Sequence, residues 1–176
     1  MKVAADTTQR TRWGIGPRWG LPTVAYLVVA ILVHYVTRPV FDIEWLSPST
    51  AAIASGCLLL AGVCLWAASA ARLRRGRRTG ALVTDGPYVV MRHPLYAAWI
   101  FLILPAACVA FRSWIVLPAP VVAYVACRLH LPAEDNLLRQ RHGEAFERYR
   151  KRTNGLLPTL PRWRRARKPA PTRKDP

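Results

Sequence analysis

The residues best suited to chemistry gather in one short stretch of the chain, residues 86–96, with the sequence GPYVVMRHPLY. Gly86 and Pro87 favour a tight turn. Pro94 suits the first turn of a helix, where its missing N–H is harmless, and Tyr96 would lie in that same turn. The pattern predicts a turn that leads into a helix and brings a guanidinium, an imidazole and two phenols to the start of that helix.

This stretch has two interpretations. Tyr88, Tyr96 and Trp99 can be aromatic anchors at a membrane surface, with Arg92 as a basic residue on the cytoplasmic side. Alternatively, the stretch belongs to a functional loop, because polar connections of about 20 residues are uncommon unless they carry function. Spacing alone gives the two interpretations equal weight.

The composition indicates which elements hold this stretch. The chain has 176 residues, of which 52% are hydrophobic, and a formal net charge of +17. A disordered basic protein would be poor in Leu, Val and Trp, and a nucleic-acid-binding domain would spread its basic residues around an ordinary core. A mean hydropathy of +0.12 instead indicates long apolar segments with basic residues outside them. This is typical of a small multi-pass membrane protein, and nucleic acid is not an expected partner.

Four apolar segments approach the roughly 20 residues that a membrane-spanning helix requires. They cover about residues 21–37, 50–71, 95–111 and 114–131. The expected fold class is therefore all-α integral membrane, with four transmembrane helices plus a cytoplasmic amphipathic C-terminal helix.

The polar segments divide the rest of the chain. Residues 1–20 precede the membrane domain, which we expect to cover residues 21–160. Within it, residues 72–94 form a connecting loop, and residues 132–151 form the amphipathic helix, since their apolar residues recur at helical spacing. Residues 161–176 alternate basic residues with prolines and predict a disordered basic tail.

The positive charges predict the orientation. They gather in residues 1–20, in the loop after the second apolar segment and after residue 131, whereas Asp42 and Glu44 accompany Arg38 between the first two segments. Both termini are therefore expected in the cytoplasm, with basic segments near anionic lipid. The arginine run 72–78 is interpreted as a stop signal. The bias toward Ala, Arg and Pro favours a bacterial source, so the expected location is a bacterial cytoplasmic membrane.

Cysteine and histidine spacing predicts neither a disulfide framework nor a metal site. Cys57, Cys64, Cys108 and Cys127 all lie in apolar segments, and none has ligand spacing with the four histidines. We expect no metal.

Two motifs give the chain a family resemblance. Residues 86–96 match the pattern G-P-Y-x-x-x-R-H-P-x-Y. An acidic pair with leucines follows at residues 134–138, then HGEAFERY at residues 142–149 and a proline-containing exit at residues 156–158. Together they resemble the signature of the isoprenylcysteine carboxyl methyltransferase family and its phospholipid methyltransferase relatives, which are integral membrane methyltransferases. The resemblance covers about residues 79–158.

The resemblance implies an enzyme that binds S-adenosyl-L-methionine in a cytoplasm-facing pocket and methylates a lipophilic substrate, such as an isoprenylcysteine carboxylate or another lipid. Carried over by position, it implies cofactor contacts at Gly80, Ala81, Leu82, Val83, Tyr88, His93, Pro94, Leu95, Tyr96 and Glu134. Loop backbone groups can bind an adenine, a carboxylate can pair with an amino group, and aromatic faces attract a sulfonium.

The chain departs from the family pattern where the substrate would bind. Related carboxyl methyltransferases have an arginine four residues before the glutamate, whereas this chain has His130 there and Arg128 two residues earlier. His130 and Arg128 are therefore the candidate substrate-binding residues. A carboxylate acceptor needs no general base, but an amine or thiol must lose a proton, for which Glu134 and His130 are the candidate catalytic residues.

Two other functions are compatible with the sequence. Sterol reductases share a similar C-terminal membrane core, so an NADPH-dependent reductase of a sterol or isoprenoid is the second hypothesis. The third is a non-enzymatic membrane anchor whose basic tail binds anionic lipid or nucleic acid.

Overall fold

The computed structural model describes residues 16–159, and within them the chain is all-helical, without a strand. The elements are α2 (Gly16–Val36), α3 (Pro48–Thr79), the 3-10 helix η1 (Gly86–Val89), α4 (Pro94–Ala98), the π-helix η2 (Trp99–Ile103), α5 (Leu104–Phe111) and α6 (Ala119–Arg150). The predicted all-α class is confirmed for this part. The predicted basic tail and most of the predicted N-terminal segment lie outside the described residues.

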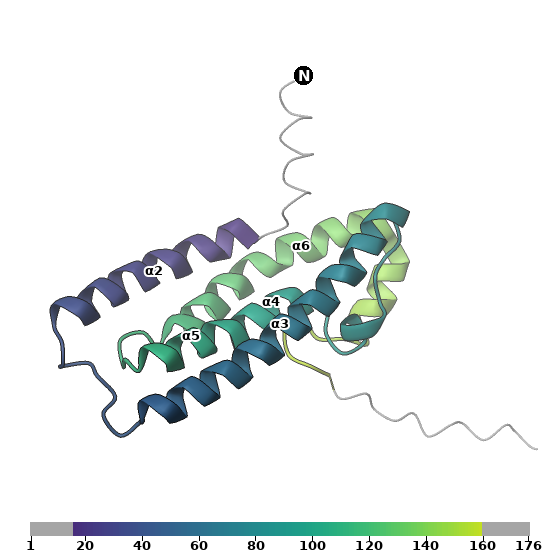
Figure 1. Ribbon diagram of the computed structural model, residues 1–176. Coiled ribbons are helices and arrows are strands. Elements are labelled where there is room, and N and C mark those ends of the chain that lie inside the picture. Colours follow the sequence, from purple (N-terminus) through teal and green to yellow (C-terminus); the bar gives the residue numbers. More distant parts are fainter. Residues whose placement is uncertain (1–15, 160–176) are drawn as a thin grey trace, which may run out of the picture.

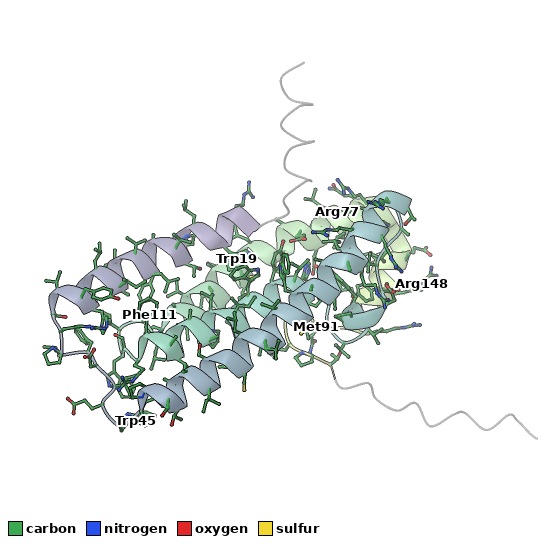
Figure 2. All side chains as sticks on the ribbon, viewed as in Figure 1. Trp19, Trp45, Arg77, Met91, Phe111 and Arg148 are labelled. Carbon is green, nitrogen blue, oxygen red and sulfur yellow. The ribbon has the colours of Figure 1, made fainter. Side chains whose placement is uncertain are left out.

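The long helices lie side by side (Figure 1). Helix α2 packs against α6, and α3 packs against the series α4, η2 and α5, which also contacts α6. The C-terminal ends of α3 and α6 share one end of the bundle, and the α2–α3 and α5–α6 connections lie at the other. Figure 2 shows the same division, with Arg77 and Arg148 at one end and Trp45 and Phe111 at the other. The basic C-terminal parts of α3 and α6 therefore gather at a single end.

Three stretches of helix are long and apolar enough to cross a membrane, namely Arg18–Val36, Pro48–Thr79 and Pro94–Phe111. Large apolar side chains such as Leu32 and Ile53 are exposed on these helices. Such extended apolar surface is expected beside lipid rather than water. The fold is compatible with a multi-pass membrane protein.

The predicted fourth span continues without a break into the predicted C-terminal helix, and the interruption in α6 lies further on, at Gly143. Pro132 lies inside α6 and does not end it, although a proline lacks the N–H donor and crowds the carbonyl four residues back. Leu131, Ala133 and Glu134 beside it favour helix. The helix departs from helical geometry at Gly143, with φ 50° and ψ −126°. The boundary expected between residues 131 and 132 is therefore absent.

Helix α3 runs to Thr79, so the arginine run is helical and the connection starts at Gly80, not at residue 72. Arginine is a good helix former, and α3 ends only where Gly80 adopts a left-handed conformation with φ 68°. This extension turns some of the arginines toward the connection that follows.

The third apolar helix contains the π-helical turn η2. The N–H of Leu104 donates to the carbonyl of Trp99, five residues back. Pro105 follows directly and has no N–H for the carbonyl of Phe101. The wider turn accommodates the proline without a break in the helix.

Gly62 lets α3 approach this turn closely. A Cβ atom at Gly62 would lie 2.7 Å from Cγ1 of Ile103 and 3.0 Å from Cβ of Leu102. Gly62→Ala is therefore expected to destabilise the protein in detergent by about 1–3 kcal/mol, as overpacking usually does, and to lower the midpoint of thermal unfolding. Gly56→Ala on the same helix is the control, because a Cβ there meets nothing within 4 Å. Equal midpoints for the two variants would contradict this packing.

Candidate active site

A cavity of about 1060 Å³ lies at the basic end of the bundle, slightly above the range of about 300–1,000 Å³ that is usual for small-molecule sites. Helix α3 contributes Trp66, Ala70, Leu73, Arg74, Gly76 and Arg77. The connection contributes Gly80, Ala81, Leu82, Val83, Tyr88, Arg92 and His93, followed by Leu95, Tyr96 and Trp99. Helix α6 contributes Glu134, Leu137, Leu138, Arg141, His142 and Tyr149.

Every residue predicted as a cofactor contact lines this cavity except Pro94. Pro94 is buried and begins α4, as its missing N–H predicted. The two sequence motifs, which lie on different helices, therefore contribute to one wall.

Glu134 projects from α6 toward the start of α4. The hydroxyl of Tyr96 donates to Oε2 of Glu134 at 2.9 Å, and Oε1 lies 4.0 Å from Nδ1 of His93. Glu134 is the one carboxylate among the described residues that line the cavity. It is therefore the lining group best suited to a cationic part of a ligand.

Asp135 joins His93 to Arg92 outside this wall. Its Oδ1 lies 3.0 Å from Nε2 of His93, and its Oδ2 accepts from Nη2 of Arg92 at 3.0 Å. Burial raises the pKa of Asp135, but the hydrogen bonds and charges of His93 and Arg92 outweigh burial and hold this pKa below its usual value. Asp135 is therefore an ionised acceptor at neutral pH.

Residues 90–93 are fixed by the chain that leaves α6. The N–H of Arg92 donates to the carbonyl of Asn154 at 2.8 Å, and that of His93 donates to Gly155 at 3.0 Å. The N–H of Thr159 returns a bond to the carbonyl of Val90 at 2.8 Å. The position of His93 is thus set by backbone contacts as well as by Asp135.

A small core beside the cavity joins η1 to the C-terminal part of α6. It consists of Tyr88, Phe146 and Tyr149, and Phe146 is fully buried. The Tyr149 hydroxyl donates to the carbonyl of Tyr88 at 2.7 Å. Burial raises the pKa of Tyr149 to about 12 and also raises the pKa of Tyr88. Both phenols are therefore neutral at neutral pH.

His130 and Arg128 do not line the cavity. Nδ1 of His130 bonds to the carbonyl of Ala126 at 2.8 Å, within its own helix. Arg128 lines a separate recess of about 350 Å³ that also contains Asp135. The structure therefore does not bring these two candidates for substrate binding and proton transfer to the other site residues.

Sequence reasoning missed the wall from α3. Arg74 and Arg77, interpreted as part of a stop signal, line the cavity with Trp66, Ala70 and Leu73. These five positions follow helical spacing and share one face of α3. Helical periodicity was the available signal, but it applies only if the helix continues through the arginines.

Sequence reasoning also missed a face of α6. Leu137, Leu138 and Arg141 follow Glu134 at i+3, i+4 and i+7, and all four side chains line the cavity. Asp135 was part of the acidic motif but had no assigned role.

The family resemblance rests on the two motifs alone. No protein-family model, no curated protein and no solved structure matches the chain. The geometry of the cavity is therefore the basis for proposing a function.

Proposed function

We propose that this protein is an integral membrane methyltransferase that uses S-adenosyl-L-methionine to methylate a lipophilic substrate, as in the isoprenylcysteine carboxyl methyltransferase and phospholipid methyltransferase family. The observation that carries the proposal is that both motifs line one cavity, where Tyr96 bonds to Glu134 at 2.9 Å. A chance match of two motifs would not require them to meet.

The residues of the cavity fit this cofactor chemically. Residues 81–84 belong to no helix and make no backbone–backbone hydrogen bond within the described part of the chain, which leaves amide and carbonyl groups for an adenine. The Glu134 carboxylate suits an amino group. The rings of Tyr88, Tyr96 and Trp99 suit a sulfonium, which aromatic faces attract.

When bound, S-adenosyl-L-methionine supplies an electrophilic methyl group. Methyl transfer is an in-line displacement, so the protein chiefly orients two reactants and excludes water. Leu73, Leu82 and Leu138 supply apolar parts of the wall that suit this exclusion.

The proposed topology has the cavity at the cytoplasmic face. The basic ends of α3 and α6 gather there (Figure 1), and positive charge favours the cytoplasmic side. With α6 added as a fourth crossing to the three apolar helices, both termini lie in the cytoplasm, and the location is a bacterial cytoplasmic membrane. A water-soluble cofactor then enters from the cytosol.

The lipophilic acceptor is proposed to enter from the membrane. Trp66 of α3 and Trp99 of η2 line the cavity from two helices that are apolar enough to span a bilayer, and Trp99 is exposed. Indole rings are frequent at the membrane–water interface. Separate entrances suit two reactants of opposite polarity.

One observation favours a second candidate. Arg74, Arg77 and Arg141 line the same cavity, and guanidinium groups bind phosphate well. A dinucleotide carries phosphates, so an NADPH-dependent reductase of a sterol or isoprenoid is the alternative. In the first proposal, the same arginines suit the carboxylate of S-adenosyl-L-methionine.

Ligand binding to the purified protein in detergent tests the proposal. Saturable binding of S-adenosyl-L-methionine and its demethylated product, with a rise in the midpoint of thermal unfolding, is expected. Stabilisation by NADPH alone would favour the reductase. Binding of neither cofactor would reject both enzymes and leave the membrane anchor, whose lipid binding would be lost on deletion of residues 161–176. A screen of methyl-acceptor lipids with labelled cofactor then identifies the substrate.

A further inference from the structure

His93 has an arrangement of partners that cofactor binding alone does not require. Its side chain lies in the cavity wall and is 5% exposed, and its two ring nitrogens face different carboxylates. We infer that His93 accepts a proton from the methyl acceptor at Nδ1, with Asp135 as its positioning residue, so that the acceptor is an amine or a thiol and not a carboxylate. This inference rests on the proposed methyl transfer.

The contact with Asp135 determines which nitrogen of His93 carries the proton. Nε2 lies 3.0 Å from Oδ1 of Asp135. Asp135 is ionised because its pKa is lowered, so it can only accept a hydrogen bond. Nε2 is therefore the donor, and the neutral ring has its lone pair on Nδ1. This is the role of a carboxylate that orients a catalytic imidazole.

Charged and titratable groups face His93 from each element packed around it. They are Arg92 from the connection, Tyr96 from α4, and Glu134 and Asp135 from α6. The two carboxylates lie near different ring nitrogens of His93, and Arg92 shares Asp135 with it. Tyr96 stacks on the imidazole at 5.7 Å between ring centroids and donates to Glu134. Asp135 and Tyr96 thus hold the ring in one orientation, with Nδ1 toward Glu134.

An acceptor that must lose a proton makes this arrangement useful. A carboxylate is already deprotonated at neutral pH, whereas an amine or thiol releases a proton as it is methylated. His130, the other candidate base of the neighbourhood, bonds to its own helix and does not line the cavity. His93 is therefore the positioned imidazole that the described cavity offers to such an acceptor.

The step balances without a further reactant. A bond forms between the nitrogen or sulfur of the acceptor and the methyl carbon, and the bond between that carbon and the sulfonium breaks with its electron pair going to sulfur. The acceptor proton moves to Nδ1 of His93. The resulting imidazolium faces Asp135, and the proton later passes to water.

Nitrogen-15 NMR of histidine-labelled protein in detergent tests the tautomer without any ligand. The resonances of His93 are assigned by their loss in His93→Gln. In the wild type, we expect neutral His93 to carry its proton on Nε2. In Asp135→Asn, the other tautomer should become populated, because an amide can donate to Nε2. A neutral wild-type His93 that carries its proton on Nδ1 would overturn the inference even if the variant fails to fold.

Turnover provides the second readout. It is measured with amine or thiol lipids. Asp135→Asn should lower kcat by about 10²-fold, with little change in KM for S-adenosyl-L-methionine, because general-base catalysis contributes about 10²–10⁴-fold. Glu144→Gln is the matched control, since its side chain is 93% exposed on the same helix.

The choice of acceptor separates this inference from the proposed function. If carboxylate lipids are methylated as fast as amine and thiol lipids, and Asp135→Asn has wild-type kcat, the inference is wrong while the methyltransferase function stands. If the protein does not bind S-adenosyl-L-methionine, the proposed function itself is wrong.

Discussion

Glu134→Gln is expected to weaken the binding of S-adenosyl-L-methionine by about 10- to 100-fold, measured by isothermal titration calorimetry in detergent. The substitution keeps the size of the side chain and an acceptor for Tyr96 but removes the negative charge. No second carboxylate among the described lining residues can replace it. A hydrogen bond to a charged group contributes about 1.5–3 kcal/mol, and each 1.4 kcal/mol is a factor of about ten in Kd.

Glu144→Gln removes the same charge from an exposed position of α6 and should leave the affinity unchanged. An equal loss in both variants would show that net charge, and not the cavity, controls binding. Wild-type affinity in Glu134→Gln would show that the cofactor does not pair with this carboxylate.

Arg92→Met should cause a large loss of stability, about 3–5 kcal/mol, seen as a lower midpoint of thermal unfolding in detergent. Arg92 donates to Asp135 at 3.0 Å, to the carbonyl of Arg150 at 3.3 Å and to the carbonyl of Thr153. Methionine has a similar length but no donor, so Asp135 would keep only His93 as a partner. Removal of one member of a buried ion pair commonly costs this much.

The pH dependence separates lost charge from lost packing. The native pKa of Asp135 lies below the ordinary value of 3.8, so its contribution to stability is present above that value and is lost as pH falls through the native pKa. The difference between wild type and Arg92→Met should therefore be largest near neutral pH and shrink in acid. Arg148→Met, with a side chain that is 69% exposed, should change little. A difference that is constant with pH would assign the loss to packing alone.

Local geometry at the first motif could be predicted because it depends on adjacent residues. A turn at Gly86 and Pro87 and a helix start at Pro94 follow from the restricted backbone of glycine and proline, and both are present as η1 and α4. That Glu134 and Tyr96 lie at the same site was predicted only through the resemblance of the two motifs to a family, because nothing local to either residue requires it.

Two other features could not be predicted for physical reasons. Hydropathy detects where side chains leave an apolar environment, not where backbone hydrogen bonds end. The second helix was therefore predicted to end before its arginines, whereas α3 continues to Thr79. The pairing of residues 90–93 with residues 154–159 uses backbone groups, which every residue type provides. Such contacts leave no side-chain pattern to read.

The π-helical turn at Trp99–Ile103 determines how far α4 is rotated relative to α5 about their common axis. An α-helix rotates by about 100° per residue, and a π-turn holds one residue more than an α-turn. If the same residues formed a regular α-helix instead, the additional residue would rotate Leu95 and Tyr96 relative to α5 by about that angle. The alignment of Tyr96 with Glu134 therefore depends on the backbone geometry of an apolar segment, and not only on the polar residues that meet there.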